Sequence, residues 1–288
     1  MENLSDISVI RALLERHGFR FSKSLGQNFL TNPTVCPRMA EECGAGKGVG
    51  VLEIGPGFGV LTQQLALRAS KVVAVELDNR LIPVLDETLS EFGNVTVVEG
   101  DILKLDASAL ISEHFEGLNV VVCANLPYYI TSPVIMKLLE ERLPIENMTV
   151  MVQKEAADRL CAPVGSRESG AVTAAVSYYA EPEKLFTVSA GSFMPPPKVD
   201  SAVIRLKIRK TPPVSPQDEK FFFSVIRAAF SQRRKTSLNA ISSGLQLPKD
   251  VVAGAFASCG LDGRIRAERI TLEQFAAVSD ALCRTEKI

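Results

Sequence analysis

Histidine, paired cysteines and long hydrophobic runs are scarce in this sequence. The 288 residues include only two histidines, His17 and His114, and none of the six cysteines belongs to a Cys-x-x-Cys pair. A zinc site therefore has few candidate ligands, and a Ser-His-Asp or Cys-His enzyme is disfavoured. No apolar run approaches the roughly 18–20 residues of a membrane span, and residues 1–11 lack the apolar core of a secretory signal. We therefore expect a cytoplasmic protein with free thiols, no metal and no membrane partner.

Charge is nearly balanced overall, at −1, but it is unevenly distributed along the chain. Residues 76–120 carry ten acidic and two basic residues, whereas residues 198–240 carry ten basic and three acidic residues. A basic block of this kind is expected where a phosphate backbone binds. A solvated protein surface has the same composition, so charge alone leaves both interpretations open.

Short β-rich runs alternate with helical ones from residue 48 onward. Four apolar runs, at 50–55, 71–77, 94–100 and 118–126, are predicted to be strands buried on both faces. The helical spacing between them predicts a mostly parallel, doubly wound α/β sheet. Beyond the proline-rich segment 211–217 every pattern is helical. We therefore predict a first domain over 1–211, with an N-terminal helix and loop at 1–47, and a small all-helical domain over 212–288.

A glycine-rich turn follows the first of these strands. Gly55, Gly57 and Gly59 form a G-x-G-x-G spacing, which lets the backbone turn sharply and approach a ligand closely. Glu76 ends the next strand, where a carboxylate can accept hydrogen bonds from both hydroxyls of a ribose. The spacing differs from the G-x-G-x-x-G of dinucleotide sites, which argues against an NAD-dependent oxidoreductase. The pattern indicates a nucleoside-containing ligand, and a plain surface turn is the alternative.

Two further strands end in polar residues. Asp101 and Ile102 follow the third strand, and a carboxylate there can accept the amine of an adenine ring. Asn125-Leu126-Pro127-Tyr128 follows the fourth strand, where open parallel sheets place active sites. This string offers oxygen acceptors and a flat ring, which suit a planar base with an amino group. Structural turns remain the alternative for both.

Three consecutive prolines, 195–197, follow Phe193 and hold an extended segment. Such a segment can present Phe193 to the second face of a bound base. From these residues alone, a stiff connection with a core phenylalanine is the preferred interpretation.

Five strings in fixed order carry a close resemblance to a known family. They are SLGQNFL at 24–30, EIGPGFGVLT at 53–62, NLPYYITSPV at 125–134, FMPPPKVDSAV at 193–203 and AAFSQRRKTSLN at 228–239. Over roughly residues 8–285 the chain resembles the KsgA family of ribosomal RNA adenine dimethyltransferases. The resemblance implies a Rossmann-like methyltransferase domain that uses S-adenosylmethionine (SAM), followed by a small helical domain. It also implies dimethylation, at N6, of two adjacent adenosines in a hairpin loop near the 3′ end of 16S (small-subunit) ribosomal RNA.

The resemblance assigns roles to individual residues. Gln27, Asn28 and Leu30 would cover the cofactor, Gly55, Gly57 and Gly59 would lie beside its methionine part, Glu76 would bind its ribose, and Leu77, Asp101 and Ile102 would contact its adenine. Asn125, Leu126, Pro127 and Tyr128 would hold the target base, with Asn125 also at the cofactor and Phe193 as the second stacking partner. In the basic block, the expected RNA-binding residues are Lys198, Arg227, Arg233, Arg234 and Lys235. One departure is Arg167–Ala171, where the family commonly has a Tyr-Gly pair.

Three alternatives are kept open at this stage. An Erm-type enzyme would methylate large-subunit RNA, but its usual strings are SQNF and NIPY rather than GQNF and NLPY. A DNA adenine methyltransferase would have a motif closer to D/N-P-P-Y. A catalytically silent ribosome-assembly factor would keep the binding surfaces without the reaction. We expect a monomer with no obligate protein partner.

Overall fold

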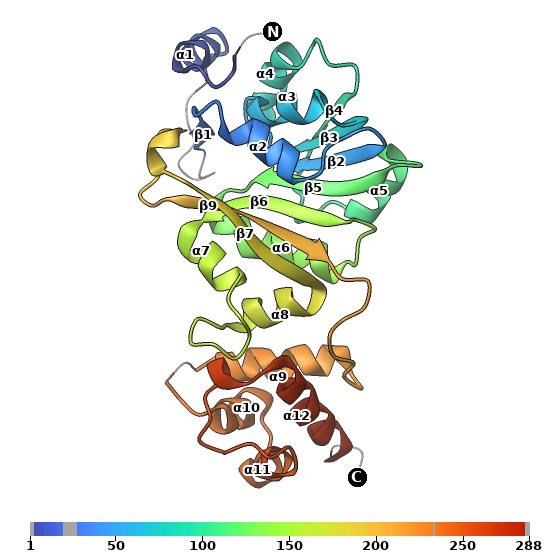
Figure 1. The fold of residues 1–288 in the computed structure, drawn as a ribbon, viewed down its shortest axis with the longest axis vertical. Helices are drawn as coiled ribbons and strands as arrows, with labels where there is room; N and C mark the ends of the chain where they lie inside the picture. The colour runs from blue at the N-terminus through green and yellow to red at the C-terminus, as the bar shows by residue number, and fades with distance from the viewer. Residues whose placement is uncertain (1–2, 20–27, 233, 286–288) are drawn as a thin grey trace. The chain divides into compact units, whose positions relative to one another are not determined.

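The computed structural model describes residues 3–19, 28–232 and 234–285 (Figure 1). The chain forms two compact units, one made of Met1–Ala157 with Pro182–Ile208 and the other of Asp158–Glu181 with Arg209–Ile288. Arg233 and Gln27, both predicted as functional residues, lie outside the described residues.

The first unit contains a seven-stranded sheet in the order β4-β3-β2-β5-β6-β9-β7. Its strands are β2 (Val49–Ile54), β3 (Lys71–Glu76), β4 (Val95–Glu99), β5 (Asn119–Asn125), β6 (Asn147–Gln153), β7 (Ala180–Val188) and β9 (Ser201–Ile208). Strands β2 to β6 are parallel to their neighbours, and β9 runs antiparallel to β6. The predicted doubly wound, mostly parallel sheet is confirmed. The prediction that residues 94–100 form a strand buried on both faces is wrong, because β4 is an edge strand and is only partly covered.

Helices cover both faces of this sheet. They are α2 (Val35–Glu42), α3 (Val60–Ala66), α4 (Ile82–Thr88), α5 (Ala107–His114) and α6 (Thr131–Glu140), with α7 (Lys154–Leu160) beginning in this unit. The N-terminal helix α1 (Ile7–Arg16) packs in a cluster with residues of α4. Val51 packs with α2 and α3 on one face. Gly50 points to the opposite face, where an added Cβ would lie 2.3 Å from the ring of Phe115, directly after α5. The alternation along β2 thus separates the two helical layers.

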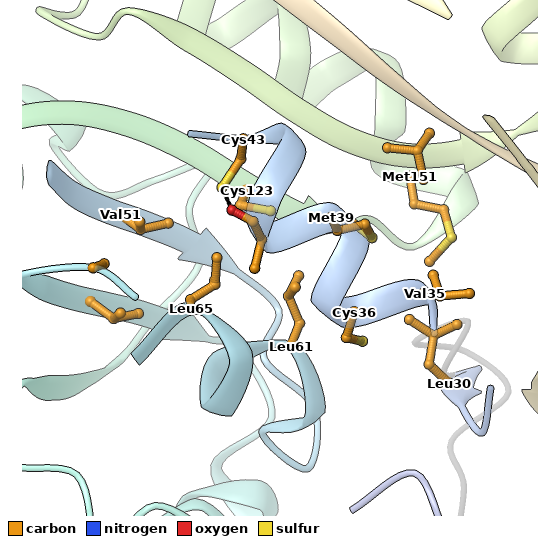
Figure 2. Packing of buried hydrophobic residues seen from close by; sticks show 14 of the residues in the cluster. Leu30, Val35, Cys36, Met39, Cys43, Val51, Leu61, Leu65, Cys123 and Met151 are labelled. Atoms are coloured by element: carbon orange, nitrogen blue, oxygen red, sulfur yellow. Dashed lines mark hydrogen bonds between the residues drawn. The ribbon is translucent and has the colours of Figure 1, made fainter. Parts of the chain in front are cut away.

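One core cluster holds α2 and α3 against the sheet, as Figure 2 shows. Met39 of α2 and Leu65 of α3 are fully buried beside Val51 of β2 and Cys123 of β5. The structure places none of the six cysteines, all within the described residues, in a disulfide, in agreement with the predicted thiols, and Cys36, Cys43 and Cys123 are buried. Burial of α2 and α3 against β2 and β5 fixes these two strands, and thereby the position of the loops that leave them.

The second unit is helical. It contains α8 (Ala171–Tyr179), α9 (Glu219–Phe230), α10 (Ser237–Leu245), α11 (Lys249–Ser258) and α12 (Leu272–Thr285). Asp218 caps α9 by accepting a hydrogen bond from the Phe221 backbone N–H at 2.9 Å. No helix in the described part of the chain has the length and apolar character that crossing a membrane requires.

The two units differ from the predicted division at residue 211 in two respects, of which the first is small: the first unit ends at Ile208. Residues 158–181 belong with the C-terminal helices. Several contacts tie α8 to α9: the hydroxyls of Tyr178 and Tyr179 both donate to the Glu219 carboxylate, at 2.8 and 3.2 Å, and the two rings pack against Phe222 and Phe223. Glu219 opens α9, so α8 is tied to a helix that follows about 40 residues later in the chain.

Candidate active site

The strand order reverses between β2 and β5. From β2 the chain builds outward through β3 and β4, and it then returns to place β5 on the other side of β2. In open α/β sheets, ligands bind in the crevice outside the carboxyl ends of the strands at such a switch point. Here the glycine-rich turn leaves β2 and the Asn125–Tyr128 segment leaves β5, so the two strongest motifs meet at this edge.

Positive φ angles explain the glycines of the turn. Gly55 has φ +71° and Gly57 has φ +61°, a backbone region that side chains with Cβ rarely adopt. A Cβ on Gly57 would lie 2.9 Å from the ring of Phe29, whereas a Cβ on Gly55 would find no atom within 4 Å. The turn therefore packs closely on one side and leaves open space on the other. Gly59 is the N-cap residue of α3 and is not part of the cavity lining.

Glu76 is held at the end of β3 by backbone donors. The N–H of Asp78 donates to its Oε1 at 2.8 Å, and the N–H of Gly57 donates to its Oε2 at 3.3 Å. Glu76 is 6% exposed, and burial is the main cause that raises the pKa of this carboxyl. The carboxylate therefore links the β3 end to the glycine turn and still faces the cavity described below.

Asp101 and Leu77 occupy the β3–β4 side of the site. The backbone N–H of Leu103 donates to Asp101 Oδ1 at 3.0 Å, and Lys104 Nζ lies 3.6 Å from Oδ2. Leu77 is 49% exposed and lines the cavity described below. Ile102 is buried beside them.

The segment after β5 is fixed by several hydrogen bonds. Asn125 Nδ2 donates to the backbone carbonyl of Asn28, at 3.5 Å. Leu126 N–H donates to the Met151 carbonyl of β6 at 3.3 Å. The hydroxyl of Tyr128 lies 2.7 Å from the Ser201 hydroxyl of β9, and burial raises the pKa of Tyr128. The side chains of Asn125 and Tyr128 thus have defined positions.

A two-stranded sheet brings Phe193 to the site from far along the chain. β1 (Phe29–Leu30) pairs antiparallel with β8 (Phe193–Met194), and Leu30 stands opposite Phe193. The N–H of Thr31 donates to the Ser192 carbonyl at 2.9 Å. Phe193 is 5% exposed, so it combines a core position with a place in the cavity wall.

One cavity joins these residues. Among the predicted residues it is lined by Asn28, Leu30, Gly55, Gly57, Glu76, Leu77, Asp101, Ile102, Asn125, Leu126, Pro127, Tyr128 and Phe193. Sequence reasoning assigned no role to other lining residues, notably Cys36, Glu53, Phe29, Tyr129 and Ile130. Glu53 had a signal, since an acidic residue inside an apolar strand is rarely buried without a partner.

Glu53 is a buried acid in the cavity wall. It is 1% exposed, and its Oε2 has no hydrogen-bond partner among the described residues. Burial raises the pKa of this carboxyl to about 8, so the group is protonated at neutral pH in the folded protein.

The raised pKa predicts how stability depends on pH. Between the ordinary pKa of a glutamate and about 8, the native state binds a proton that the unfolded state releases. The free energy of unfolding should therefore decrease as pH rises through this interval, by on the order of 3 kcal/mol. Glu53→Gln, which cannot ionise, should remove most of this decrease in urea unfolding of the ligand-free protein at pH 5, 6.5 and 8. Glu99→Gln, at an exposed strand position, is the control. Equal pH dependence in wild type and Glu53→Gln would refute the assignment.

The predicted RNA-binding residues lie on the surface of both units. Lys198 is exposed in the first unit, and Arg227, Arg234 and Lys235 are exposed in the second. Lys235 also lines a small polar cleft of the second unit, together with Arg167, Ser169, Gln232, Arg266 and Glu268. The Ser169 hydroxyl is buried and has no hydrogen-bond partner among the described residues. The segment that departs from the family pattern thus contributes to a basic cleft that sequence reasoning did not identify.

The side chains and backbone that line the main cavity suit a nucleoside with an amino-acid tail. It combines two carboxylates, an open glycine turn and apolar side chains, and such a mixture of apolar walls and few polar groups is typical of cofactor sites. Within the described ranges, no group of three or more histidine, cysteine or acidic side chains is placed to hold a metal ion.

Two solved structures with this architecture are named as methyl-transferring enzymes. The 23S rRNA methyltransferase ErmE is 29% identical, with a TM-score of 0.67 over 89% of this chain and 100% of its own. A dimethyladenosine transferase from Plasmodium falciparum is 26% identical, with a TM-score of 0.69 over 87% of this chain and 95% of its own. The fold and the site together define a Rossmann-like methyltransferase.

The sequence comparisons are more specific. The family model described as ribosomal RNA adenine dimethylase matches residues 18–283. A protein of Geobacillus sp. (strain WCH70), named ribosomal RNA small subunit methyltransferase A, is 49% identical over 94% of this chain and 95% of its own length. A protein of the same name from Bacillus cereus (strain AH187) is 48% identical over 98% of both. The chain belongs to the ribosomal RNA adenine dimethylase family, which confirms the resemblance of its five strings.

Proposed function

We propose that this enzyme transfers methyl groups from SAM to N6 of two adjacent adenosines in a hairpin loop near the 3′ end of 16S ribosomal RNA. The observation that carries the proposal is the identity of 48–49%, over nearly the whole chain, to proteins named small subunit methyltransferase A. The large-subunit enzyme ErmE has the same fold at 29% identity, so an Erm-type activity is the second candidate.

The cavity residues fit SAM in one orientation. Glu76 would accept the ribose hydroxyls, Asp101 would accept the adenine amine, and Leu77 with Ile102 would cover the ring. Gly55 and Gly57 would let the backbone approach the methionine part, because the space before Gly55 is open. When bound there, SAM supplies an electrophilic methyl group on a sulfonium.

Asn125 and the backbone after it would orient the adenine amine. The N6 lone pair is delocalised into the ring, and acceptors for both N–H protons favour a more pyramidal, more nucleophilic nitrogen. The Asn125 amide donates toward the Asn28 carbonyl, which leaves its own oxygen as one acceptor. The Pro127 carbonyl already accepts from the Ile130 N–H at 3.1 Å and the Thr131 hydroxyl at 3.4 Å. The Leu126 carbonyl is therefore the better second acceptor.

Tyr128 and Phe193 would hold the flipped base between two rings. The Tyr128 ring is anchored through its bond to Ser201, and Phe193 through the pairing of β8 with β1. Each stacking contact is worth about 1–3 kcal/mol. No strong general base is required, because the alkylated nitrogen becomes acidic and loses its proton late. Most of the rate then comes from positioning, and the second transfer requires a pocket that accepts N6-methyladenine.

The helical unit, together with Lys198, would bind the RNA backbone. Arg227, Arg234 and Lys235 are exposed, and the cleft around Arg167 and Arg266 adds charge and an unpaired hydroxyl. Phosphate contacts of this kind are independent of sequence and sensitive to salt. In this arrangement the first unit performs the reaction and the second increases affinity for the small subunit, in the cytoplasm and as a monomer.

Reversing charge in the basic block should weaken this binding. We expect Arg234→Glu combined with Lys235→Glu to lower affinity for unmethylated small subunits and to reduce the slope of log affinity against log salt by about 1 per lost contact. Lys249→Glu, at an exposed position of α11, is the matched control. Binding of the double variant that equals wild type across a salt series would show that these residues do not touch RNA.

The direct test of the proposed function is methyl transfer from radiolabelled SAM. Unmethylated small subunits, large subunits, naked ribosomal RNA and DNA would be offered, and the digested nucleosides would be resolved. We expect N6,N6-dimethyladenosine from the small subunit, at two modified residues per subunit. Label in the large subunit would support the Erm-type activity. Absence of label with the cofactor bound would indicate a silent assembly factor.

A further inference from the structure

Tyr129 is an exposed aromatic residue at the active-site cavity. Its side chain is 53% exposed, and it lines the cavity beside Tyr128 and Ile130. Five large apolar or aromatic side chains are notably exposed in the described part of the chain, and Tyr129 is the aromatic one among them. Among described residues, no hydrogen bond of its hydroxyl is recorded, unlike that of Tyr128, which is bonded to Ser201.

Local geometry explains why the two tyrosines differ. Residues Tyr128–Ile130 form one turn of 3₁₀ helix directly after Pro127. With about three residues per turn, consecutive side chains diverge by about 120°, so both rings cannot point the same way. Tyr128 is anchored toward β9, and Tyr129 therefore projects toward solvent at the cavity entrance. A half-exposed ring that also lines the ligand cavity is available to contact what enters that cavity.

Covalent connectivity identifies what reaches this ring. A nucleotide whose base is held by Tyr128 is joined to its neighbour by a single phosphodiester. Tyr129 lines the same cavity as Tyr128 and is exposed, so a nucleotide one phosphodiester away from the held base is within reach of its ring. A neighbour that has lost its stacking partner to the flipped site presents an open base face, and an aromatic ring is a sequence-tolerant partner for such a face.

We propose that Tyr129 stacks on the nucleobase adjacent to the target adenosine and thereby positions the RNA strand at the cavity entrance. The inference rests on the proposed function, since it takes RNA as the substrate. Because the strand has one polarity at the site, Tyr129 meets the neighbour on one side only. For two adjacent adenosines this neighbour is the other adenine in one of the two reactions and the flanking nucleotide in the other, which a sequence-tolerant stacking contact accommodates. Tyr129 is a positioning residue, and Asn125 and Tyr128 remain the groups that touch the reacting base.

Steady-state kinetics on unmethylated small subunits tests the proposal. Tyr129→Phe keeps the ring and should leave KM for subunits within about twofold of wild type. Tyr129→Leu and Tyr129→Ala lack a stacking face and should raise KM about fivefold or more. The Kd for SAM should be unchanged in all of them. Leu67→Ala, at a residue 55% exposed but outside the cavity lining, is the matched control.

A fluorescence signature separates stacking from a merely structural role. The chain contains no tryptophan, so Tyr129→Trp introduces a single tryptophan, whose emission can be excited apart from that of the tyrosines. Protein-free RNA, at a concentration where anisotropy shows the protein to be saturated, should quench this emission and leave that of Leu67→Trp nearly unchanged.

Three results would overturn the proposal. The first is a KM for subunits that stays unchanged in Tyr129→Leu and Tyr129→Ala, and the second is a KM in Tyr129→Phe that rises as much as in those two variants. The third is equal quenching of the tryptophan emission in Tyr129→Trp and Leu67→Trp. A wild-type enzyme that methylates another RNA would instead contradict the proposed function. The same variants would then be compared on that RNA, because the inference concerns the base next to the target.

Discussion

Replacing Asn125 by alanine is expected to reduce the rate of methyl transfer at least about 100-fold while the affinity for SAM changes by less than about tenfold. The reason is that the side chain provides one of two acceptors that orient the adenine amine, and small errors in the position of a reacting atom have large effects on rate. The residue lies at the carboxyl end of β5, half-buried, with its amide toward the Asn28 carbonyl. Single-turnover transfer and calorimetry would measure the two quantities separately.

Asn119→Ala is a matched control for this prediction. Asn119 is at the opposite end of the same strand and is exposed, so its loss tests the effect of removing an asparagine from β5 without touching the cavity. Equal losses of transfer and of cofactor affinity in Asn125→Ala would contradict the assigned role. They would instead show that Asn125 acts mainly on the cofactor or on the local fold.

Replacing Glu76 by glutamine is expected to raise the Kd for SAM about 10- to 100-fold. The carboxylate is buried and already accepts backbone N–H bonds from Asp78 and Gly57. An amide of the same shape has one acceptor oxygen fewer, and hydrogen bonds to a charged group contribute about 1.5–3 kcal/mol each. Glu76→Ala should have a larger effect, because it also leaves the two backbone donors without their acceptor. Calorimetric titration with SAM would measure both variants.

Glu99→Gln is the control for this substitution. Glu99 stands opposite Glu76 in the pairing of β4 with β3, but it is exposed on the edge strand. The two variants remove the same charge from neighbouring strands, and only one of them faces the cavity. A Kd for SAM that is unchanged in Glu76→Gln would contradict the ribose-binding assignment.

Local motifs predicted the parts of the site that depend on the backbone. The glycine turn and the Asn125–Tyr128 segment were placed correctly, because each follows an apolar run that ends at the same edge of a parallel sheet. The helical pattern expected after the proline-rich segment 211–217 is likewise found, beginning with α9 at Glu219. These features depend on residues within a few positions of each other.

Features that depend on distant contacts were missed. Residues 158–181 belong with the C-terminal helices because two tyrosines of α8 bind Glu219, which no local pattern indicates. β4 looks like a buried strand in sequence, but its place at the sheet edge leaves it partly exposed. The proline-rich segment around Phe193 favoured a core position for this ring. Its place in the cavity wall follows from the pairing of β8 with β1.

The amino-acid sequence by itself determined the family, the doubly wound fold and most of the residues at the switch point, because strand patterns and ordered motifs are encoded locally. Tertiary structure decided which of these residues share one cavity, and it added Glu53 and Tyr129 to the wall. The protonation of Glu53 and the exposure of Tyr129 are consequences of burial and side-chain direction. Both quantities depend on what packs around a residue, and packing is set by strands and helices that lie far away in the chain.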